Sequence, residues 1–361
     1  MQSFRASALC GAAVAAVALA WSNPGHAYEP GDFGQYLSGN NIGAMIAAPP
    51  PPGLYGVLDT FVAPRGTGVG QNLGNSTTSF LFAPTLFWST GYKFLGANVS
   101  MAVVQPFLET AVYPTNGASL GGNNSGPPFG GTVWFDNIEN TQLTPLFLQW
   151  TLGQGWFAGT AMTFIIPDGS RYNGTLNSDY FSYQPRAFLA YANKDWHISA
   201  NFRYDINSPS AGHTGAYQIA ANLPFPLGFG GTPLSATVAG IGNGYRSGDV
   251  AFLDAAALYQ YKRWEFGPVA SFKYQTTNDT PGGGFTCASL RASLPTSLQC
   301  GKSENVAIGG LVGLDLGAVH MQAWLTDTVH TKDDFGGLGV YSRLVFPLWA
   351  PEAPTRPLIT K

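Results

Sequence analysis

The sequence has 361 residues, including 46 Gly and 26 Pro, and only 10% of its residues are charged, against about 25% in an ordinary soluble domain. Its 45% hydrophobic content and formal net charge of -3 exclude intrinsic disorder, which combines low hydrophobicity with high net charge. The 17 Lys and Arg residues do not exceed the 20 Asp and Glu residues. This balance excludes a nucleic-acid partner, because binding to phosphates requires excess positive charge.

The first 27 residues have the features of a secretory signal peptide. Arg5 supplies the positive charge, residues 9–21 form the apolar core, and residues 25–27 give a small-residue cleavage pattern. We expect cleavage between Ala27 and Tyr28. A retained anchor helix is disfavoured, because the apolar core is shorter than a bilayer crossing and a proline and a glycine follow at once.

Two cysteines remain after cleavage, Cys287 and Cys300, in a polar and turn-rich segment. An even cysteine count in an exported chain predicts one disulfide between them. A metal site is the weaker interpretation, because no nearby His or third Cys completes a tetrahedral set of ligands. The sequence also contains no His-x-x-x-His pair and no acidic calcium loop, so we expect neither a metal nor a cofactor.

Alternation of apolar and polar residues dominates the second half of the chain. Residues 196–207 (WHISANFRYDIN) place aromatic and aliphatic side chains on one face of a strand and polar side chains on the other. Residues 180–191 and 264–275 repeat the pattern. Beyond the first 22 residues no apolar run approaches the roughly 18 residues of a transmembrane helix. One face of each strand therefore suits lipid, and the other suits water.

Strand and turn signals divide the mature chain into about twelve strands. We expect these strands at residues 54–63, 78–90, 96–110, 141–152, 156–166, 180–192, 196–207, 249–261, 264–277, 303–316, 318–331 and 338–348. Tight connections at residues 91–95, 153–155, 193–195, 262–263 and 317 alternate with long ones near 64–77, 111–140, 167–179, 208–248 and 278–302, and with a shorter one at 332–337.

This alternation of connections predicts an all-β fold, a transmembrane antiparallel up-and-down β-barrel with short periplasmic turns and long extracellular loops. The strand number has a range of about ten to fourteen, since residues 216–223 and 235–241 within the loop at 208–248 form a possible extra hairpin. The expected location is the outer membrane of a Gram-negative bacterium, with outer-membrane lipid as the surrounding partner.

The chain then divides into a signal peptide at residues 1–27, a lead at 28–52, a barrel at 53–349 and a tail at 350–361. The lead ends in four consecutive prolines, which cannot join the interior of a sheet. We expect it to lie in the periplasm or to insert into the lumen as a plug. The proline run as a polyproline ligand for another protein is the less favoured alternative.

Three stretches carry motifs of Gly, Pro and aromatic residues, at residues 43–55 (GAMIAAPPPPGLY), 92–106 (YKFLGANVSMAVVQP) and 144–172 (TPLFLQWTLGQGWFAGTAMTFIIPDGSRY). These stretches resemble the outer-membrane proteins associated with the meta pathway of phenol degradation. The resemblance implies an outer-membrane barrel that takes up small hydrophobic or aromatic solutes, and it supplies no catalytic set. The tail departs from the usual aromatic end of such barrels. Phe346 or Trp349 would then signal insertion to the barrel assembly machinery.

If the aromatic faces meet lipid, the opposite faces line the pore. The predicted pore-lining residues are Gln149, Gln184, Arg186, His197, Asn201, Arg203, Asp205, Asp254, Gln260, Glu265, Lys273, Gln275, Asp315, His320, Gln322 and Arg343. Two roles stay open for them. Their charges either pair within a filled barrel or shape the passage of solutes. A barrel of about twelve strands lies between filled and open sizes.

An enzyme is not expected, because no Gly-x-Ser-x-Gly motif occurs and no His has a recognisable hydrolase context. His197 and His320 fall on the polar faces of their strands. We therefore expect a channel or transporter for small hydrophobic or aromatic solutes that works by passive diffusion. The alternatives are a structural or adhesive barrel with a closed lumen and, less favoured, a lipid-modifying barrel enzyme.

Overall fold

The computed structural model describes most of the chain from Tyr36 onward. The described residues are 36–63, 75–114, 133–169, 179–210, 228–229, 232–233, 244–284, 286–287, 302–332, 334 and 336–351. Within these ranges no helix has the length and apolar character needed to cross a membrane. The described part of the chain is built mainly from strands.

The strands run antiparallel in a single large sheet, apart from two very short ones. Their bounds are β1 Gly53–Ala63, β2 Asn75–Phe94, β3 Ala97–Val104, β4 Phe107–Pro114, β5 Val133–Ile138, β6 Thr141–Gly153, β7 Trp156–Ile166, β8 Ser182–Ala192, β9 Trp196–Asn207, β10 Gly228–Phe229, β11 Thr232–Pro233, β12 Val250–Tyr261, β13 Trp264–Gln275, β14 Glu304–Asp315, β15 His320–Lys332 and β16 Leu338–Trp349.

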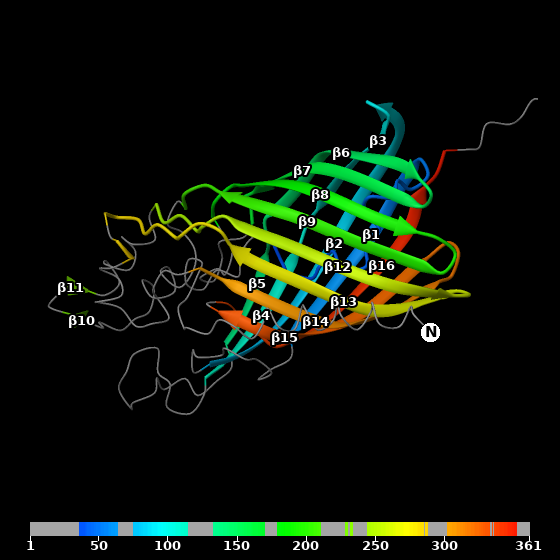
Figure 1. Cartoon of the computed structure of the whole chain (residues 1–361). Coiled ribbons are helices and arrows are strands. Elements are labelled where there is room, and N and C mark those ends of the chain that lie inside the picture. Colours follow the sequence, from blue (N-terminus) through cyan, green and yellow to red (C-terminus); the bar gives the residue numbers. More distant parts are fainter. Residues whose placement is uncertain are drawn as a thin grey trace, which may run out of the picture.

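The sheet closes on itself because β1 pairs along one edge with β16 and along the other with β2 (Figure 1). The strands β3 and β4 follow each other along the flank of β2, and β5 and β6 do the same along β4 and β3. Counting each of these two pairs as one interrupted strand gives twelve strands around the barrel in the described part of the chain. The predicted fold class is confirmed.

The first half of the barrel departs from the predicted boundaries. Strand β2 continues to Phe94, and the turn consists of Leu95 and Gly96, both with positive φ. The next strand is interrupted at Gln105 and Pro106, because proline has no amide hydrogen for the ladder. The predicted loop at 111–140 is wrong at both ends, since β4 reaches Pro114 and β5 begins at Val133.

The predicted extra hairpin between residues 208 and 248 is only partly described. Within that stretch β10 and β11 pair with each other and with no barrel strand. Residues 216–223 and 235–241, in which the hairpin was expected, lie outside the described residues. The described barrel closes without a contribution from this stretch.

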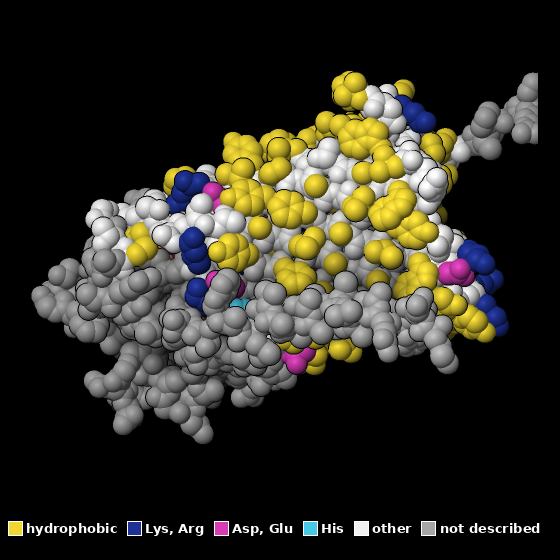
Figure 2. Space-filling model, in the orientation of Figure 1, with side chains coloured by type: hydrophobic (Ala, Val, Ile, Leu, Met, Phe, Trp, Pro, Cys, Tyr) yellow, Lys and Arg dark blue, Asp and Glu magenta, His cyan; other side chains and the backbone are white. Residues whose placement is uncertain are grey.

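The two faces of the barrel differ in chemistry, as the alternation predicts. Figure 2 shows hydrophobic side chains covering the visible outer surface, with charged side chains near the two rims. Phe202, Phe266 and Leu325 are among the exposed hydrophobic residues, while the inner face contains buried Gln184, Arg203 and others. In lipid the outward apolar surface needs no further cover, because it faces hydrocarbon.

An arginine placed on this outer surface should be costly near the bilayer centre and cheap at the rim. We expect Leu325→Arg, halfway along β15, to lower the free energy of unfolding by about 2–4 kcal/mol in lipid vesicles. The matched control Leu348→Arg, at the end of β16, should cost no more than about 1 kcal/mol. Equal losses in denaturant titrations of the two variants would contradict the assigned depth.

Candidate functional site

The lumen contains a cavity of about 730 Å³ that is lined by residues from most of the barrel strands. The walls differ in polarity. On β1 to β4 the lining is largely apolar, with Val57, Phe61, Leu81 and Val104 among the residues, whereas β8, β9 and β13 contribute charged side chains such as Arg186. A volume of this size is typical of pockets for small molecules.

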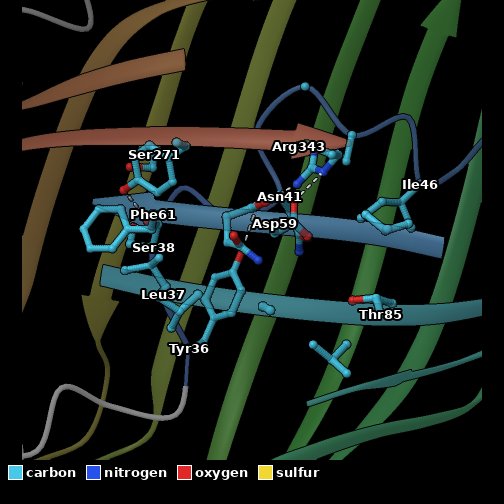
Figure 3. Close-up of a pocket in the computed structure, with 18 of the residues that line it drawn as sticks. Tyr36, Leu37, Ser38, Asn41, Ile46, Asp59, Phe61, Thr85, Ser271 and Arg343 are labelled. Carbon is cyan, nitrogen blue, oxygen red and sulfur yellow. Dashed lines mark hydrogen bonds and ion pairs between the residues drawn. The ribbon is translucent and has the colours of Figure 1, made fainter. Parts of the chain in front are cut away.

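Residues 36–50, here called the plug segment, lie inside the barrel (Figure 3). They form a series of turns, with hydrogen bonds from the Asn40 amide to the Leu37 carbonyl and from the Ala44 amide to the Asn41 carbonyl. Gly43 has a φ of 69°, and a Cβ at this position would stand 2.6 Å from Leu311 Cδ1. Glycine is therefore favoured at this turn against the wall, because any other residue would be strained at this φ and would displace the Leu311 side chain.

Wall side chains bind the plug segment mainly through its backbone carbonyl oxygens. Gln149 Nε2 donates to the Ile46 carbonyl at 2.6 Å, and Asn201 Nδ2 donates to the Asn41 and Ala44 carbonyls at 2.8 and 3.1 Å. The barrel wall thus satisfies backbone acceptors that would otherwise be buried without a partner.

Arg343 on β16 joins the plug segment to the wall where the barrel closes. Its Nε donates to Asp59 Oδ1 on β1 at 2.8 Å, as Figure 3 shows, and its Nη1 donates to the Ile42 carbonyl at 2.9 Å. Arg343 Nη2 also donates to the Asn40 carbonyl. Both partners of the ion pair are buried, so each charge depends on the other.

Asp254 on β12 holds the beginning of the plug segment. The Tyr36 hydroxyl donates to Asp254 Oδ2 at 2.7 Å, and the amides of Gly39 and Asn41 donate to the same carboxylate at 3.0 Å each. The Tyr36 ring also packs edge-on against Phe252, with ring centroids 5.0 Å apart. This carboxylate is therefore fully engaged with the plug segment.

Two apolar clusters hold the plug segment at opposite sides of the lumen. Ile42 is completely buried with Leu258, Leu311 and Trp324 on one side. Ala47 packs on the other side with residues of β3, β6, β7 and β8. Burying these side chains favours the inserted position over exposure to water.

A second hollow, of about 260 Å³, lies at the rim with the tight turns. There Glu265 accepts hydrogen bonds from Gln260 at 2.9 Å and from Gln322 at 2.7 Å, and its two oxygens lie 3.2 Å from His197 Nδ1 and 3.0 Å from His320 Nε2. The buried carboxylate is thus enclosed by four polar side chains, one of which also bonds the plug segment.

The predicted pore residues fall into three groups. Those that line the large cavity are Gln149, Arg186, His197, Arg203, Glu265, Lys273, His320, Gln322 and Arg343, and those that line the hollow at the rim alone are Gln260 and Asp315. The remaining ones are buried and line neither space, namely Gln184, Asn201, Asp205, Asp254 and Gln275. The part of all these predicted pore residues in solute passage stays a prediction.

Two acidic partners of these residues were not predicted from the sequence. Asp59 pairs with Arg343, and Asp334 pairs with Lys273 at 2.8 Å. A single acidic residue on the apolar face of a strand, as at Asp59, is a usable signal for a buried ion pair. Asp334 comes from the connection after β15, which has no pattern of its own.

Some of the expected features lie outside the described residues. These are the signal peptide with its cleavage site at Ala27 and Tyr28, the beginning of the lead, and Cys300. Within the described part of the chain, no group of three or more His, Cys, Asp and Glu side chains is arranged to bind a metal ion.

Comparison with known proteins gives both a family and a fold. A sequence family described as "Putative MetA-pathway of phenol degradation" matches residues 61–344, whereas no curated protein matches. The COG4313 outer membrane channel from Pseudomonas putida F1 has a TM-score of 0.58 at 11% identity, over 84% of this chain and 98% of that one.

A second solved structure, the transport unit of the autotransporter AIDA-I from Escherichia coli, gives a TM-score of 0.46 at 12% identity, over 90% of this chain and 100% of that one. The fold is that of an outer-membrane channel, and the chain belongs in the outer membrane of a Gram-negative bacterium, surrounded by lipid.

Removing one member of the buried ion pair should be far more costly than removing a surface charge. We expect Asp59→Asn to lower the free energy of unfolding by about 3–5 kcal/mol, because it leaves Arg343 buried without its counter-charge. Asp195→Asn, which removes a half-exposed partner of Lys194, should stay within about 1 kcal/mol. Denaturant titration in lipid vesicles measures both losses of unfolding free energy. Similar losses would show that the Asp59–Arg343 pair stabilises the barrel no more than the surface pair does.

Proposed function

The chain belongs to the Putative MetA-pathway of phenol degradation family, and from this premise we propose that it is a passive outer-membrane channel for small hydrophobic or aromatic solutes. The observation that carries the proposal is the cavity of about 730 Å³ inside a barrel with a channel fold. The proposal involves no covalent chemistry.

The asymmetric lining of the cavity supports the solute class. A small aromatic solute can place its ring against the apolar wall formed by residues such as Phe61, Leu81 and Val104. Its polar substituent then faces Arg186, Arg203 and the plug segment on the opposite side. A sugar or an inorganic ion would gain nothing from the apolar wall, since its hydration favours a polar lining on all sides.

The plug segment controls the opening in this proposal. It crosses the lumen and is bonded to β6, β9, β12, β15 and β16. Its bonds are numerous but individually ordinary, so partial release during solute passage is physically reasonable. The amino-terminal signal peptide with cleavage after Ala27, the disulfide between Cys287 and Cys300, and insertion by the barrel assembly machinery belong to the same proposal.

A barrel with a closed lumen is the second candidate, and the seated plug segment is the observation that favours it. Such a barrel would have a structural or adhesive role and would present its extracellular loops to other surfaces. The two candidates differ in one measurable property, because a closed barrel conducts neither ions nor solutes with its plug segment in place.

Deleting residues 37–48 should raise the single-channel conductance of the refolded protein in a planar bilayer, because the deletion removes the wall contacts across the lumen. Aromatic solutes should reduce the current through the full chain if they share the path. A measurable conductance that stays unchanged on deletion would contradict the role of the plug segment. No conductance from either form would favour the structural barrel.

A point substitution tests the same idea with the chain length preserved. Gly43→Ala should raise the conductance, because the new methyl group would stand 2.6 Å from Leu311 Cδ1 in a turn of positive φ. Gly96→Ala is the matched control. It also has a positive φ but nothing within 4 Å, and it lies in a turn at the rim.

Making the apolar wall polar should slow aromatic solutes selectively. We expect Leu81→Asn together with Val104→Asn to lower the flux of benzyl alcohol into proteoliposomes, while the flux of a small polar solute stays the same or rises. Thr85→Val on the same wall should not lower the aromatic flux. A proportional change for both solutes would mean that the wall does not select.

A further inference from the structure

Two buried arginines face each other on the lumen side of β8 and β9. Arg186 and Arg203 are direct cross-strand partners, and they are 9% and 4% exposed. Among the described residues, no carboxylate oxygen lies within the 4.0 Å of an ion pair from either guanidinium group. Buried charges are normally paired, so this arrangement requires an explanation.

Several donor atoms of the two arginines have no hydrogen-bond partner. They are Nε of Arg186 and both Nε and Nη1 of Arg203. The side chains also line the cavity. These donor atoms are themselves buried, so a guanidinium group must rotate toward the cavity to present them to an acceptor in the lumen. A planar guanidinium group matches the geometry of a carboxylate.

The plug segment already places an oxygen atom between the two arginines. In the amide orientation that matches acceptor to donor, Asn41 Oδ1 accepts from Nη2 of Arg186 and from Nη2 of Arg203, at 3.0 Å each. This oxygen occupies the position that one carboxylate oxygen of a solute would take. The amide is neutral, so it contributes hydrogen bonds without compensating the two positive charges.

Aromatic rings lie against both guanidinium groups. The Tyr36 ring of the plug segment covers Arg203, whose Cζ lies 3.5 Å from the ring centroid. Arg186 lies 4.9 Å from the ring centroid of Phe188 and 5.6 Å from that of Phe147, and the two rings stack with centroids 6.0 Å apart. Phe87 meets Phe147 edge-on at 5.6 Å. Phe87 and Phe147 both line the cavity. An aromatic ring joined to an anionic group would therefore find both of its parts complemented.

The nearby acidic residues do not form ion pairs with the two guanidinium groups in the described part of the chain. Asp254 accepts hydrogen bonds from Tyr36 and from the amides of Gly39 and Asn41, so its oxygens are engaged with the plug segment. Asp205 lies two residues from Arg203 on β9. Asp205 and Asp254 both attract the two arginines electrostatically, but neither forms an ion pair with them among the described residues. Lys273 pairs with Asp334 and adds no free charge.

We propose that Arg186 and Arg203 bind the carboxylate of an aromatic acid inside the lumen, and that Asn41 occupies this site while the plug segment is seated. Binding of the acid displaces the Asn41 amide and thereby loosens the plug segment. This inference rests on the proposed channel function and specifies a solute class for it.

The test measures binding of three aromatic probes to the refolded full chain in detergent by isothermal titration calorimetry. The probes are benzoate, benzyl alcohol and benzylammonium, which share a ring and differ in charge. We expect benzoate to bind at least about tenfold more tightly than benzyl alcohol, because hydrogen bonds to charged groups are stronger than neutral ones. Benzylammonium should bind most weakly. Equal affinity for benzoate and benzyl alcohol would overturn the site.

Substitution of both arginines identifies the residues responsible. Arg186→Gln with Arg203→Gln should abolish the preference for benzoate over benzyl alcohol. The control Arg263→Gln removes a charge from an exposed turn residue and should keep the preference. Preserved benzoate affinity in the double variant would overturn the proposal.

The Asn41 side chain offers an independent pair of variants that leaves the wall intact. Asn41→Ala vacates the site and should tighten benzoate binding, whereas Asn41→Asp supplies a carboxylate of its own and should weaken it. A purely structural Asn41 would not give changes of opposite sign, and changes of the same sign would overturn the proposal. These variants decide the matter even if the arginine double variant does not fold.

Flux measurements separate this inference from the channel proposal. One outcome is that benzyl alcohol enters proteoliposomes through the wild-type chain while benzoate binds no more tightly than benzyl alcohol. In that case the channel function stands and the arginine site is wrong. If no aromatic probe crosses, with or without residues 37–48, the channel function is wrong. The binding data then judge the arginine site on their own.

Discussion

Closure of the barrel through β1 is the constraint on which the rest of the structure depends. In lipid every backbone amide and carbonyl must find its partner within the protein, so a sheet with an open edge is excluded. Pairing of β1 with both β16 and β2 removes the last two edges. The same strand carries Asp59, which holds Arg343 on β16, and it follows the plug segment directly. The closing strand, the buried ion pair and the lumen contents are therefore one connected unit.

The sequence was sufficient for the barrel because lipid and water impose a period of two on every strand. Residues 196–207 show this most clearly, and β9 has the predicted bounds. Tight turns such as 262–263 are also marked, since few residues separate two strongly alternating runs. The boundaries were wrong around residues 91–140, where Pro106 interrupts a strand and the alternation around it is weak.

The contents of the lumen could not be derived in the same way. The plug segment has no periodic pattern, since its position is fixed by contacts with Gln149, Asn201 and Arg343, which are distant in the chain. The polar faces of the strands predicted which side chains point inward. They did not predict which charges pair, because Asp59 and Asp334 meet their partners only through strand order and loop position.

The reliance of the plug segment on backbone carbonyl contacts has a consequence for how this protein can vary. Each residue of the segment offers the same backbone carbonyl oxygen, whatever its side chain. Wall residues such as Gln149 and Gln322 therefore hold the segment without depending on most of its side chains. The side chains that the wall does contact specifically are few, chiefly Tyr36, Asn41, Ile42 and Ala47, and Gly43 is required by its turn. At its other positions the segment can exchange side chains that face the cavity, which changes the lining of the lumen while the barrel stays the same.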